Sequence, residues 1–390
     1  MDNLRRVFTP VSLILGTVVA ASMLSSCSQD SSQQAAPSTP SSTPTASQSE
    51  QPSSATSSMS ATSSTPQAVA LDPVQLRKDA ASLMMVGVGN FDDALFAIQQ
   101  GAGGIFIGSG TDPQILTTPG RDIAELRRIA GRPLSVAIDF EGGRVLRHRG
   151  ILGDFPSPQV MAQTMTPEQV RGMAYDMGRS LFAHGINVNF APVVDIEAGL
   201  EVVGDRAFSP DPLIDATYAT AFAQGMADAG VRPVLKHFPG HGRASGDSHT
   251  AQVHTPPLAE LEKLDLIPYG LVPVAGAGVM VGHMIVPGLG APETPSTINP
   301  AAYQLLRSGS YPGGQPFSGV IYTDDLTMGA VTSLMPTVQA VPAALAAGAD
   351  QALWVSTAGL VEAIDATVAA VSEGRYPVEQ FKASVARVAG

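Results

Sequence analysis

Histidines and acidic residues that could transfer protons or bind a metal are concentrated in one short stretch of the chain. Four of the seven histidines lie between residues 237 and 254. The core of this stretch is Lys236–Gly242, which reads KHFPGHG, and it is followed by Asp247-Ser248-His249. Three kinds of role are compatible with these residue types.

The first role is a metal site, because His and Asp at short spacing can ligate zinc. Against it, the stretch has no H-E-x-x-H pattern, and its Gly and Pro residues indicate a loop. The second is structural, with histidines bonded to the carbonyls of a tight loop. The third is acid/base catalysis. Asp247 lies two residues before His249, and a carboxylate bonded to an imidazole raises its basicity and fixes its tautomer. The spacing alone does not separate these roles.

Eight short apolar runs, each bounded by Gly, Pro or Asp, alternate with helix-like stretches in residues 71–390. Repeated strand–helix units predict a parallel sheet, and eight of them fit a (β/α)8 TIM barrel. We therefore expect an α/β fold with a single catalytic domain, and a doubly wound open sheet is the alternative. One helix start is well marked by Thr166, Pro167 and Gln169. The runs are Leu83–Val88, Gly104–Ile107, Leu134–Ile138, Val188–Val194, Val231–Leu235, Gly278–Gly282, Val320–Thr323 and Gln351–Val355.

Polar residues follow these runs, where a barrel places its catalytic residues. Because the carboxyl ends of the strands meet at one face, these side chains should lie close together. They are Asp139 and Glu141 after the third run, Asp195 after the fourth, Lys236 and His237 after the fifth, His283 after the sixth, and Asp324 and Asp325 after the seventh.

Composition excludes several classes of protein. The net charge is −12 and there is no basic cluster, which argues against nucleic-acid binding. The single cysteine excludes a structural disulfide and a Cys-based zinc or iron–sulfur site. The glycine-rich segment 101–104 leads into a strand rather than a helix, so it is no dinucleotide fingerprint. We expect no metal, no organic cofactor and a monomer.

The N-terminal residues resemble an export signal. Arg5 and Arg6 precede an apolar stretch, Val7–Met23, which ends in Leu24-Ser25-Ser26-Cys27. The position of the only cysteine resembles a bacterial lipoprotein lipobox, which implies a signal peptide over 1–26 and an acylated Cys27. The alternatives are a plain signal peptide or a short membrane span. The lipobox implies an exported protein, anchored by lipid at the extracytoplasmic face of the cell membrane.

Residues 27–70 form the second expected segment. After Cys27 they are mainly Ser, Thr, Pro, Gln and Ala, and they cannot bury enough apolar surface to offset chain entropy. We expect a disordered linker from the anchor to a catalytic domain at 71–390.

Four segments together resemble the bacterial β-N-acetylglucosaminidases of glycoside hydrolase family 3, in the single-barrel form. The stretch from Lys236 to His249 resembles a long and specific motif of the family, and the other segments occur in the family's order. They are DFEGGRVLR at 139–147, GDRAF at 204–208 and TDDLTM at 323–328. The resemblance spans roughly residues 75–390.

The resemblance implies a role for each matching residue. Asp324 matches the nucleophile, which forms a covalent glycosyl-enzyme in retaining glycosidases. His249 matches an unusual histidine acid/base, and Asp247 its orienting partner, on a loop that could close when sugar binds. The residues matched to sugar binding are Asp139, Arg147, Arg206, Lys236 and His237.

Four further strand-end residues are less firmly tied to the sugar site. Asp195 and His283 have weaker claims to the sugar site, and a satisfied position at a strand end is at least as good an interpretation for each. Asp325 is expected to cap the segment that follows it. Glu141 is expected to brace the turn at Gly142-Gly143.

The implied activity is removal of terminal, non-reducing β-linked GlcNAc, from GlcNAc–MurNAc muropeptides of the cell wall. Three alternatives stay open: a β-glucosidase of the same family, a GlcNAc phosphorylase, and a lipoprotein that binds wall glycans without catalysis. A neutral histidine repels phosphate less than a carboxylate would, so phosphorolysis is physically possible. A β-glucosidase of this family usually takes its acid/base from a carboxylate in a later domain.

The lipobox generates a direct prediction. Replacing Cys27 by Ala removes the acylated thiol, so the protein should leave the membrane fraction or stop being processed. Metabolic labelling with a fatty acid, followed by membrane fractionation, checks this. Unchanged labelling and fractionation would rule out the anchor.

Overall fold

The computed structural model describes residues 72–197, 203–272 and 275–390. The expected signal peptide at 1–26, the linker at 27–70 and Cys27 lie outside these residues. Within the described ranges, no helix is both long enough and apolar enough to span a bilayer.

Eight parallel strands form one sheet in the order β10-β1-β2-β3-β6-β7-β8-β9. A parallel bridge between Tyr322 and Gln351 joins the two ends of this order, which closes the sheet into a barrel. The expected α/β barrel is therefore confirmed, and the alternative of a doubly wound open sheet is excluded. The strands are β1 (Met84–Gly87), β2 (Gly104–Ile107), β3 (Ser135–Ile138), β6 (Val188–Asn189), β7 (Arg232–Phe238), β8 (Gly278–Val281), β9 (Ile321–Thr323) and β10 (Ala352–Trp354).

Each expected apolar run overlaps one of these strands, but two of the strands differ from their runs in length. The run Val188–Val194 holds only the two-residue β6 and then a single bridge at Val193. Pro192 lies between them and has no N–H to donate to a ladder. Strand β7 is longer than expected and extends through Lys236 and His237 to Phe238. These two polar residues therefore belong to the strand rather than to the loop after it.

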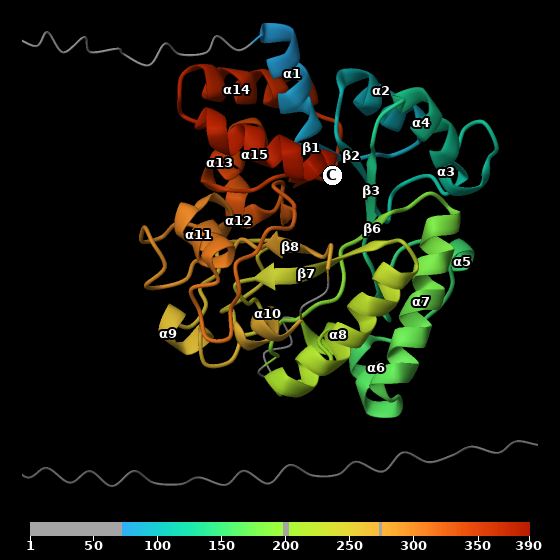
Figure 1. The fold of residues 1–390 in the computed structure, drawn as a ribbon, viewed down its shortest axis with the longest axis vertical. Helices are drawn as coiled ribbons and strands as arrows, with labels where there is room; N and C mark the ends of the chain where they lie inside the picture. The colour runs from blue at the N-terminus through green and yellow to red at the C-terminus, as the bar shows by residue number, and fades with distance from the viewer. Residues whose placement is uncertain (1–71, 198–202, 273–274) are drawn as a thin grey trace, which may run out of the picture. The chain divides into compact units, whose positions relative to one another are not determined.

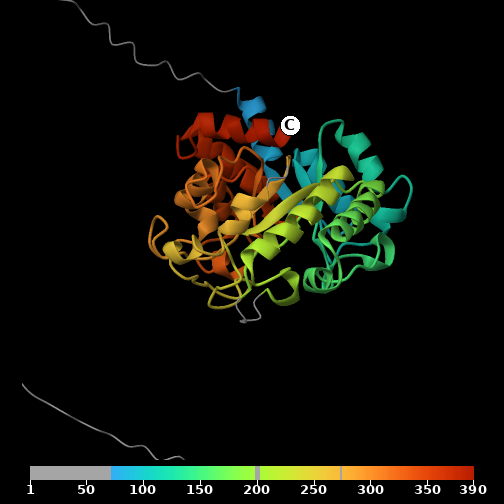
Figure 2. The same ribbon diagram turned by 60° about the horizontal axis from the view of Figure 1, so that its bottom comes forward.

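The helices surround the strands, as Figure 1 shows. Helices α7 and α8 pack side by side, and α15 lies near α1 in the views of Figures 1 and 2. The helices are α1 (Pro73–Ser82), α2 (Phe91–Gln100), α3 (Gln114–Thr117), α4 (Ile123–Ala130), α5 (Arg149–Leu152), α6 (Pro158–Thr164), α7 (Pro167–Ala183), α8 (Pro212–Asp228), α9 (Leu258–Leu261), α10 (Ile267–Leu271), α11 (Pro300–Ser308), α12 (Gly329–Thr332), α13 (Thr337–Ala347), α14 (Leu360–Ser372) and α15 (Val378–Ala389), with 3₁₀ turns η1 (Gly204–Arg206) and η2 (Ser296–Ile298).

The start of α7 confirms the expected capping box. The Gln169 N–H donates to Thr166 Oγ1 at 3.3 Å, and the Thr166 N–H donates to Gln169 Oε1 at 2.8 Å. These reciprocal bonds satisfy donors that a helix start otherwise leaves without partners.

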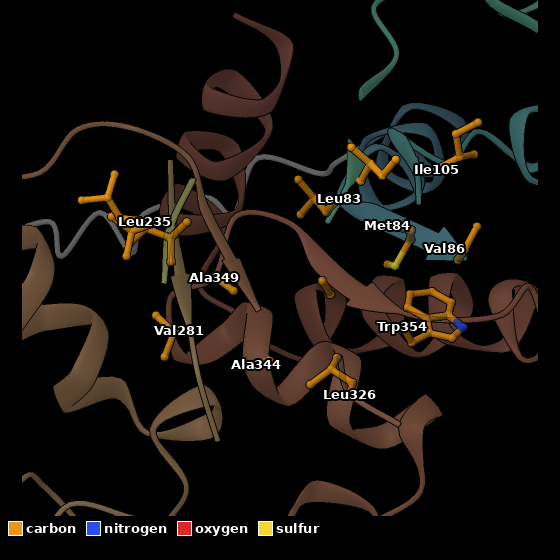
Figure 3. Close-up of a cluster of buried hydrophobic side chains, with 14 of the residues drawn as sticks. Leu83, Met84, Val86, Ile105, Leu235, Val281, Leu326, Ala344, Ala349 and Trp354 are labelled. Carbon is orange, nitrogen blue, oxygen red and sulfur yellow. The ribbon is translucent and has the colours of Figure 1, made fainter. Parts of the chain in front are cut away.

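Alternation along the strands divides the core into two apolar clusters. Met85 of β1 faces the barrel interior together with Val234, Tyr322 and Leu353 of other strands. The neighbouring residues of β1 join the larger cluster, which also contains helix residues, and Figure 3 shows part of that cluster. Period-two alternation in a closed sheet produces this division, so the interior is packed rather than open.

A short antiparallel hairpin interrupts the third strand–helix unit. Its strands β4 (Phe140–Gly142) and β5 (Val145–Leu146) follow β3 directly. The hairpin carries the acidic residues after β3 across the carboxyl-terminal end of the barrel.

Candidate active site

A cavity of about 690 Å³ lies at the carboxyl-terminal ends of the strands. All the site residues predicted from the described part of the sequence line it except Asp247. Asp247 lines an adjoining hollow of about 220 Å³, which shares His249 and Asp324 with the main cavity. The residues brought together in the main cavity are Asp139, Arg147, Arg206, Lys236, His237, His249 and Asp324.

The centre of the site is a buried ion cluster around Lys236. Its Nζ lies 2.7 Å from Asp139 Oδ1 and 2.7 Å from Glu141 Oε1. Arg206 forms a two-pronged pair with Glu141, with Nε and Nη2 each 2.8 Å from a carboxylate oxygen. Arg147 Nη2 is farther, 3.8 Å from Asp139 Oδ2. The cluster joins β3, the β4–β5 hairpin, η1 and β7.

The electrostatics of this cluster follow from burial and pairing. Burial alone would raise the pKa of Glu141, but the charges of Arg206 and Lys236 lower it to about 2. Burial would lower the pKa of Lys236, but Asp139 and Glu141 raise it above its usual value. Both groups are therefore charged near neutral pH.

The expectation for Glu141 was wrong. Its side chain is fully buried and bonded to Arg206 and Lys236, rather than bracing the Gly142-Gly143 turn. Its position explains why: residue 141 lies in β4 and faces two cations contributed by later segments. A single acidic residue before two glycines carries no local sign of those distant partners.

Asp195 fixes the ring and backbone of the histidine segment. Its Oδ2 accepts a hydrogen bond from His237 Nδ1 at 2.6 Å, and its Oδ1 accepts from the backbone N–H groups of His237 and His241. With Nδ1 bonded to Asp195, Nε2 is the ring nitrogen of His237 that is left for a ligand. Asp195 is completely buried, so it acts through His237 rather than on the cavity.

Asp324 follows β9 and borders the cavity. Its Oδ1 accepts a hydrogen bond from the Asp325 N–H at 2.8 Å, and its own N–H donates to the Val281 carbonyl at 3.0 Å. Burial would raise the pKa of Asp324, but His237, His283, the Asp325 N–H and Lys236 lower it well below its usual value. Asp324 is therefore an ionised carboxylate, and its backbone is bonded to Val281 at the end of β8.

Asp247 and His249 form the hydrogen bond that the sequence predicts. His249 Nδ1 donates to Asp247 Oδ1 at 2.7 Å, and the His249 N–H donates to the same oxygen at 2.9 Å. The other ring nitrogen, Nε2, is therefore the one left to exchange a proton with a substrate. The His249 side chain is 69% exposed and the Asp247 side chain 63% exposed, so this pair is far more open to solvent than the Lys236 cluster.

The loop that carries this pair is docked on the segment after Asp324. The N–H groups of Gly329 and Ala330 donate to the carbonyls of His249 and Ser248 at 2.9 and 3.1 Å. A side-chain carbon at Gly329 would lie only 2.5 Å from the Thr250 carbonyl oxygen, so this close approach requires glycine. The contact links the position of His249 to that of Asp324.

His283 and Asp325 have the structural positions expected of them. The two ring nitrogens of His283 lie 2.6 Å from Thr297 Oγ1 and 2.8 Å from the Asp325 carbonyl oxygen. Asp325 Oδ1 accepts from the Thr327 N–H at 2.9 Å. Burial lowers the pKa of His283, although the nearby Asp324 carboxylate opposes this shift.

Across the part of the chain that the structure describes, no group of three or more His, Cys, Asp or Glu side chains could hold a metal ion. The histidine-rich stretch instead divides into His237 bonded to Asp195, His241 beside Ser248, His249 bonded to Asp247 and His254 bonded to Glu293. The absence of a metal requirement stays a prediction.

The buried cluster generates a pH-dependent prediction. Glu141→Gln should destabilise the fold by about 3–5 kcal/mol near neutral pH, because it leaves the buried Arg206 without its carboxylate partner and Lys236 with Asp139 alone. The pKa of Glu141 is about 2 in the folded protein against 4.5 as its ordinary value. The stabilising effect is therefore complete above about pH 4.5 and is lost as the pH falls toward 2.

Urea unfolding of both proteins across this pH range checks the prediction. The difference in unfolding free energy should narrow as the solution becomes more acidic. Glu379→Gln is a matched control, since this side chain is 89% exposed and its one ion pair among the described residues is with Lys382 on the surface. A difference that is small at neutral pH, or that stays constant with pH, would contradict the account of the cluster.

Comparison with known proteins identifies the family. Residues 75–390 match the glycosyl hydrolase family 3 N terminal domain. The chain is 46% identical over 320 residues to the Mycobacterium tuberculosis protein named Beta-hexosaminidase LpqI. This match covers 80% of this chain and 81% of that protein.

Solved structures agree with this match. A family 3 glycosyl hydrolase from Mycobacterium smegmatis superposes with a TM-score of 0.78 at 46% identity, covering 80% of this chain and 96% of that one. A family 3 β-N-acetylglucosaminidase from Paenibacillus superposes with a TM-score of 0.73 at 32% identity, covering 82% of this chain and 62% of that one. The profile match and the 46% identical relative, together with the barrel, show that this chain belongs to glycosyl hydrolase family 3.

Proposed function

We propose that this family 3 glycoside hydrolase is a retaining exo-β-N-acetylglucosaminidase that removes terminal, non-reducing β-linked GlcNAc. The names of its relatives, β-hexosaminidase and β-N-acetylglucosaminidase, support this activity. The observation that carries the mechanism is that an ionised Asp324 and a His249–Asp247 pair border one cavity.

The first chemical step follows from the state of these groups. The Asp324 carboxylate attacks the anomeric carbon while the leaving-group oxygen takes the Nε2 proton of a protonated His249, which becomes neutral. The bond from the sugar to the aglycone breaks, and an ester between sugar and Asp324 forms. The lowered pKa of Asp324 keeps the nucleophile ionised for this step.

The second step reverses the role of the histidine. The neutral His249 Nε2 takes a proton from water, the water oxygen bonds to the anomeric carbon, and Asp324 leaves as a carboxylate. Two displacements at one carbon retain the configuration. Asp247 holds the ring by its bond to Nδ1, so the free nitrogen stays Nε2 in both steps.

The remaining cavity residues supply donors and acceptors for sugar hydroxyls. We assign Asp139, Lys236, His237, Arg147 and Arg206 to this role. The bond to Glu141 uses Nε and Nη2 of Arg206 and leaves its Nη1 group for the sugar. Because the ion cluster is buried, these groups are held in place before substrate binds, which reduces the cost of ordering them.

The proposed substrate is a GlcNAc–MurNAc muropeptide at the cell wall. Its support is the export signal and lipobox of the sequence, with Cys27 as the anchor on the extracytoplasmic face of the membrane. In this proposal residues 27–70 tether the barrel, and the enzyme acts as a monomer without a metal or organic cofactor.

Two related activities are tested by the same assay. Release of 4-nitrophenol from the GlcNAc and glucose β-glycosides separates the proposed activity from a β-glucosidase. Repeating the assay with phosphate, and analysing the sugar product, separates hydrolysis from phosphorolysis. A product carrying a 1-phosphate would show that phosphate replaces water in the second step.

The division of labour between Asp324 and His249 provides the decisive kinetic test. Asp324→Ala should abolish turnover of every substrate, because no covalent intermediate can form. His249→Ala should lose about 10²–10⁴-fold in turnover with poor leaving groups. With 4-nitrophenol, which leaves easily as an anion, it should instead show a burst and a low apparent KM.

Azide distinguishes a lost base from a misfolded site. It needs no deprotonation, so it should restore turnover of His249→Ala and yield the β-azide. His254→Ala is the control, because this histidine ends the same loop, bonds to Glu293 and lies outside the lining of both hollows. Appreciable activity of Asp324→Ala, or a His249→Ala variant without azide rescue, would contradict the assignment.

Metal independence is a further prediction. The histidine stretch uses its side chains in separate hydrogen bonds, so a chelator such as EDTA should leave turnover unchanged. Metal analysis of the dialysed enzyme accompanies the assay. Activity that disappears on chelation and returns with zinc would overturn the prediction of metal independence.

A further inference from the structure

A second cavity, of about 450 Å³, lies at the opposite end of the barrel from the candidate active site. Residues at the amino-terminal ends of five strands line it, from Ser82 before β1 to Arg232 at the start of β7. The end of α15, residues 388–390, lines it as well. Its Val388 packs against the apolar cluster in the barrel interior.

Three arginines from separate segments converge on this cavity: Arg127 of α4, Arg132 before β3, and Arg232 of β7. Hydrogen bonds to neutral oxygens hold each one in place. Arg127 donates to the carbonyls of Gly185 and Leu134 at 2.8–3.2 Å.

The other two guanidiniums are anchored by fewer bonds. Arg132 Nη2 donates to the Ala102 carbonyl at 2.6 Å, and a longer bond of 3.4 Å runs from Nη1 to the Pro133 carbonyl. Arg232 Nη1 lies 3.2 Å from the Tyr322 hydroxyl in the barrel interior. Because a guanidinium has five N–H donors, both retain donors that these bonds do not use.

The three positive charges have no anionic partner in the described chain. None of Arg127, Arg132 and Arg232 takes part in an ion pair there. Gly390 also lines the cavity, but none of the three arginines forms an ion pair with its carboxylate. Each is only partly exposed, and burial lowers the pKa of Arg127 and Arg132. At the other end of the barrel, by contrast, Arg206 is matched by Glu141.

A buried amide beside this cavity also has unused hydrogen-bonding capacity. Gln351 is fully buried, and neither its Oε1 nor its Nε2 has a partner among the described residues. A side-chain carbon at Gly103, which lines the cavity, would lie 3.1 Å from this Nε2. Buried polar groups in native proteins nearly always have a partner, so water or a polar ligand is expected next to Gln351.

We propose that the cavity at the amino-terminal end of the barrel binds a small oxyanion of the phosphate type, held by Arg127, Arg132 and Arg232. Guanidinium groups match phosphate oxygens in geometry and charge, and three of them together neutralise a dianion that water would otherwise have to solvate. The bound anion would connect α4 with the starts of β3 and β7. This site is distinct from the catalytic cavity and does not depend on the proposed hydrolysis.

Titration calorimetry with inorganic phosphate at constant ionic strength tests the proposal, with chloride as the reference anion. Arg132→Gln should weaken phosphate binding about 10- to 100-fold, the loss expected for one charged hydrogen bond. Arg128→Gln is the matched control, because Arg128 is 72% exposed, pairs with Glu125 and lies outside the cavity lining. The control should bind phosphate like the parent protein.

Turnover of the 4-nitrophenyl glycoside and thermal unfolding show whether each variant is folded. Crystals grown with selenate provide a second measurement, since its anomalous signal should mark a position among the three guanidiniums. Equal phosphate affinity in both variants, or selenate found only at the carboxyl-terminal cavity, would overturn the proposal. So would a parent protein that binds phosphate no better than chloride.

Discussion

Lys236 and its two carboxylate partners set the geometry of the whole catalytic end of the barrel. A buried cation must be paired, because removing one partner leaves a charge that water can no longer solvate. Lys236 meets this demand by bonding Asp139 after β3 and Glu141 in β4, while Arg206 closes the cluster from η1. The result is a group of donors and acceptors that its own ion pairs hold at the strand ends.

The acid/base pair is built differently. Asp247 and His249 are mostly exposed, and a pair in that position contributes little to stability. Their location depends instead on backbone bonds from Gly329 and Ala330, just after Asp324. A fixed sugar site beside a more open loop suits an enzyme whose histidine must give a proton to a leaving group and then take one from water.

The sequence predicts the barrel well because periodic apolar runs reflect burial on both faces of each strand. It also predicts the Asp247–His249 bond, since both partners are two residues apart. It does not predict the partners of Glu141 or the bond from Asp195 to His237, because these join residues 65 and 42 positions apart. The same holds for Arg127, Arg132 and Arg232, whose convergence depends on how the strand starts meet in three dimensions.

The central claim is that Asp324 forms the covalent bond to the sugar while His249 moves the protons. Mass spectrometry of the His249→Ala protein, quenched in acid after mixing with 4-nitrophenyl GlcNAc, tests it most directly. The account predicts one N-acetylglucosaminyl group, located by peptide fragmentation on Asp324. A sugar bound to another side chain, or rapid product release without any labelled protein, would contradict it.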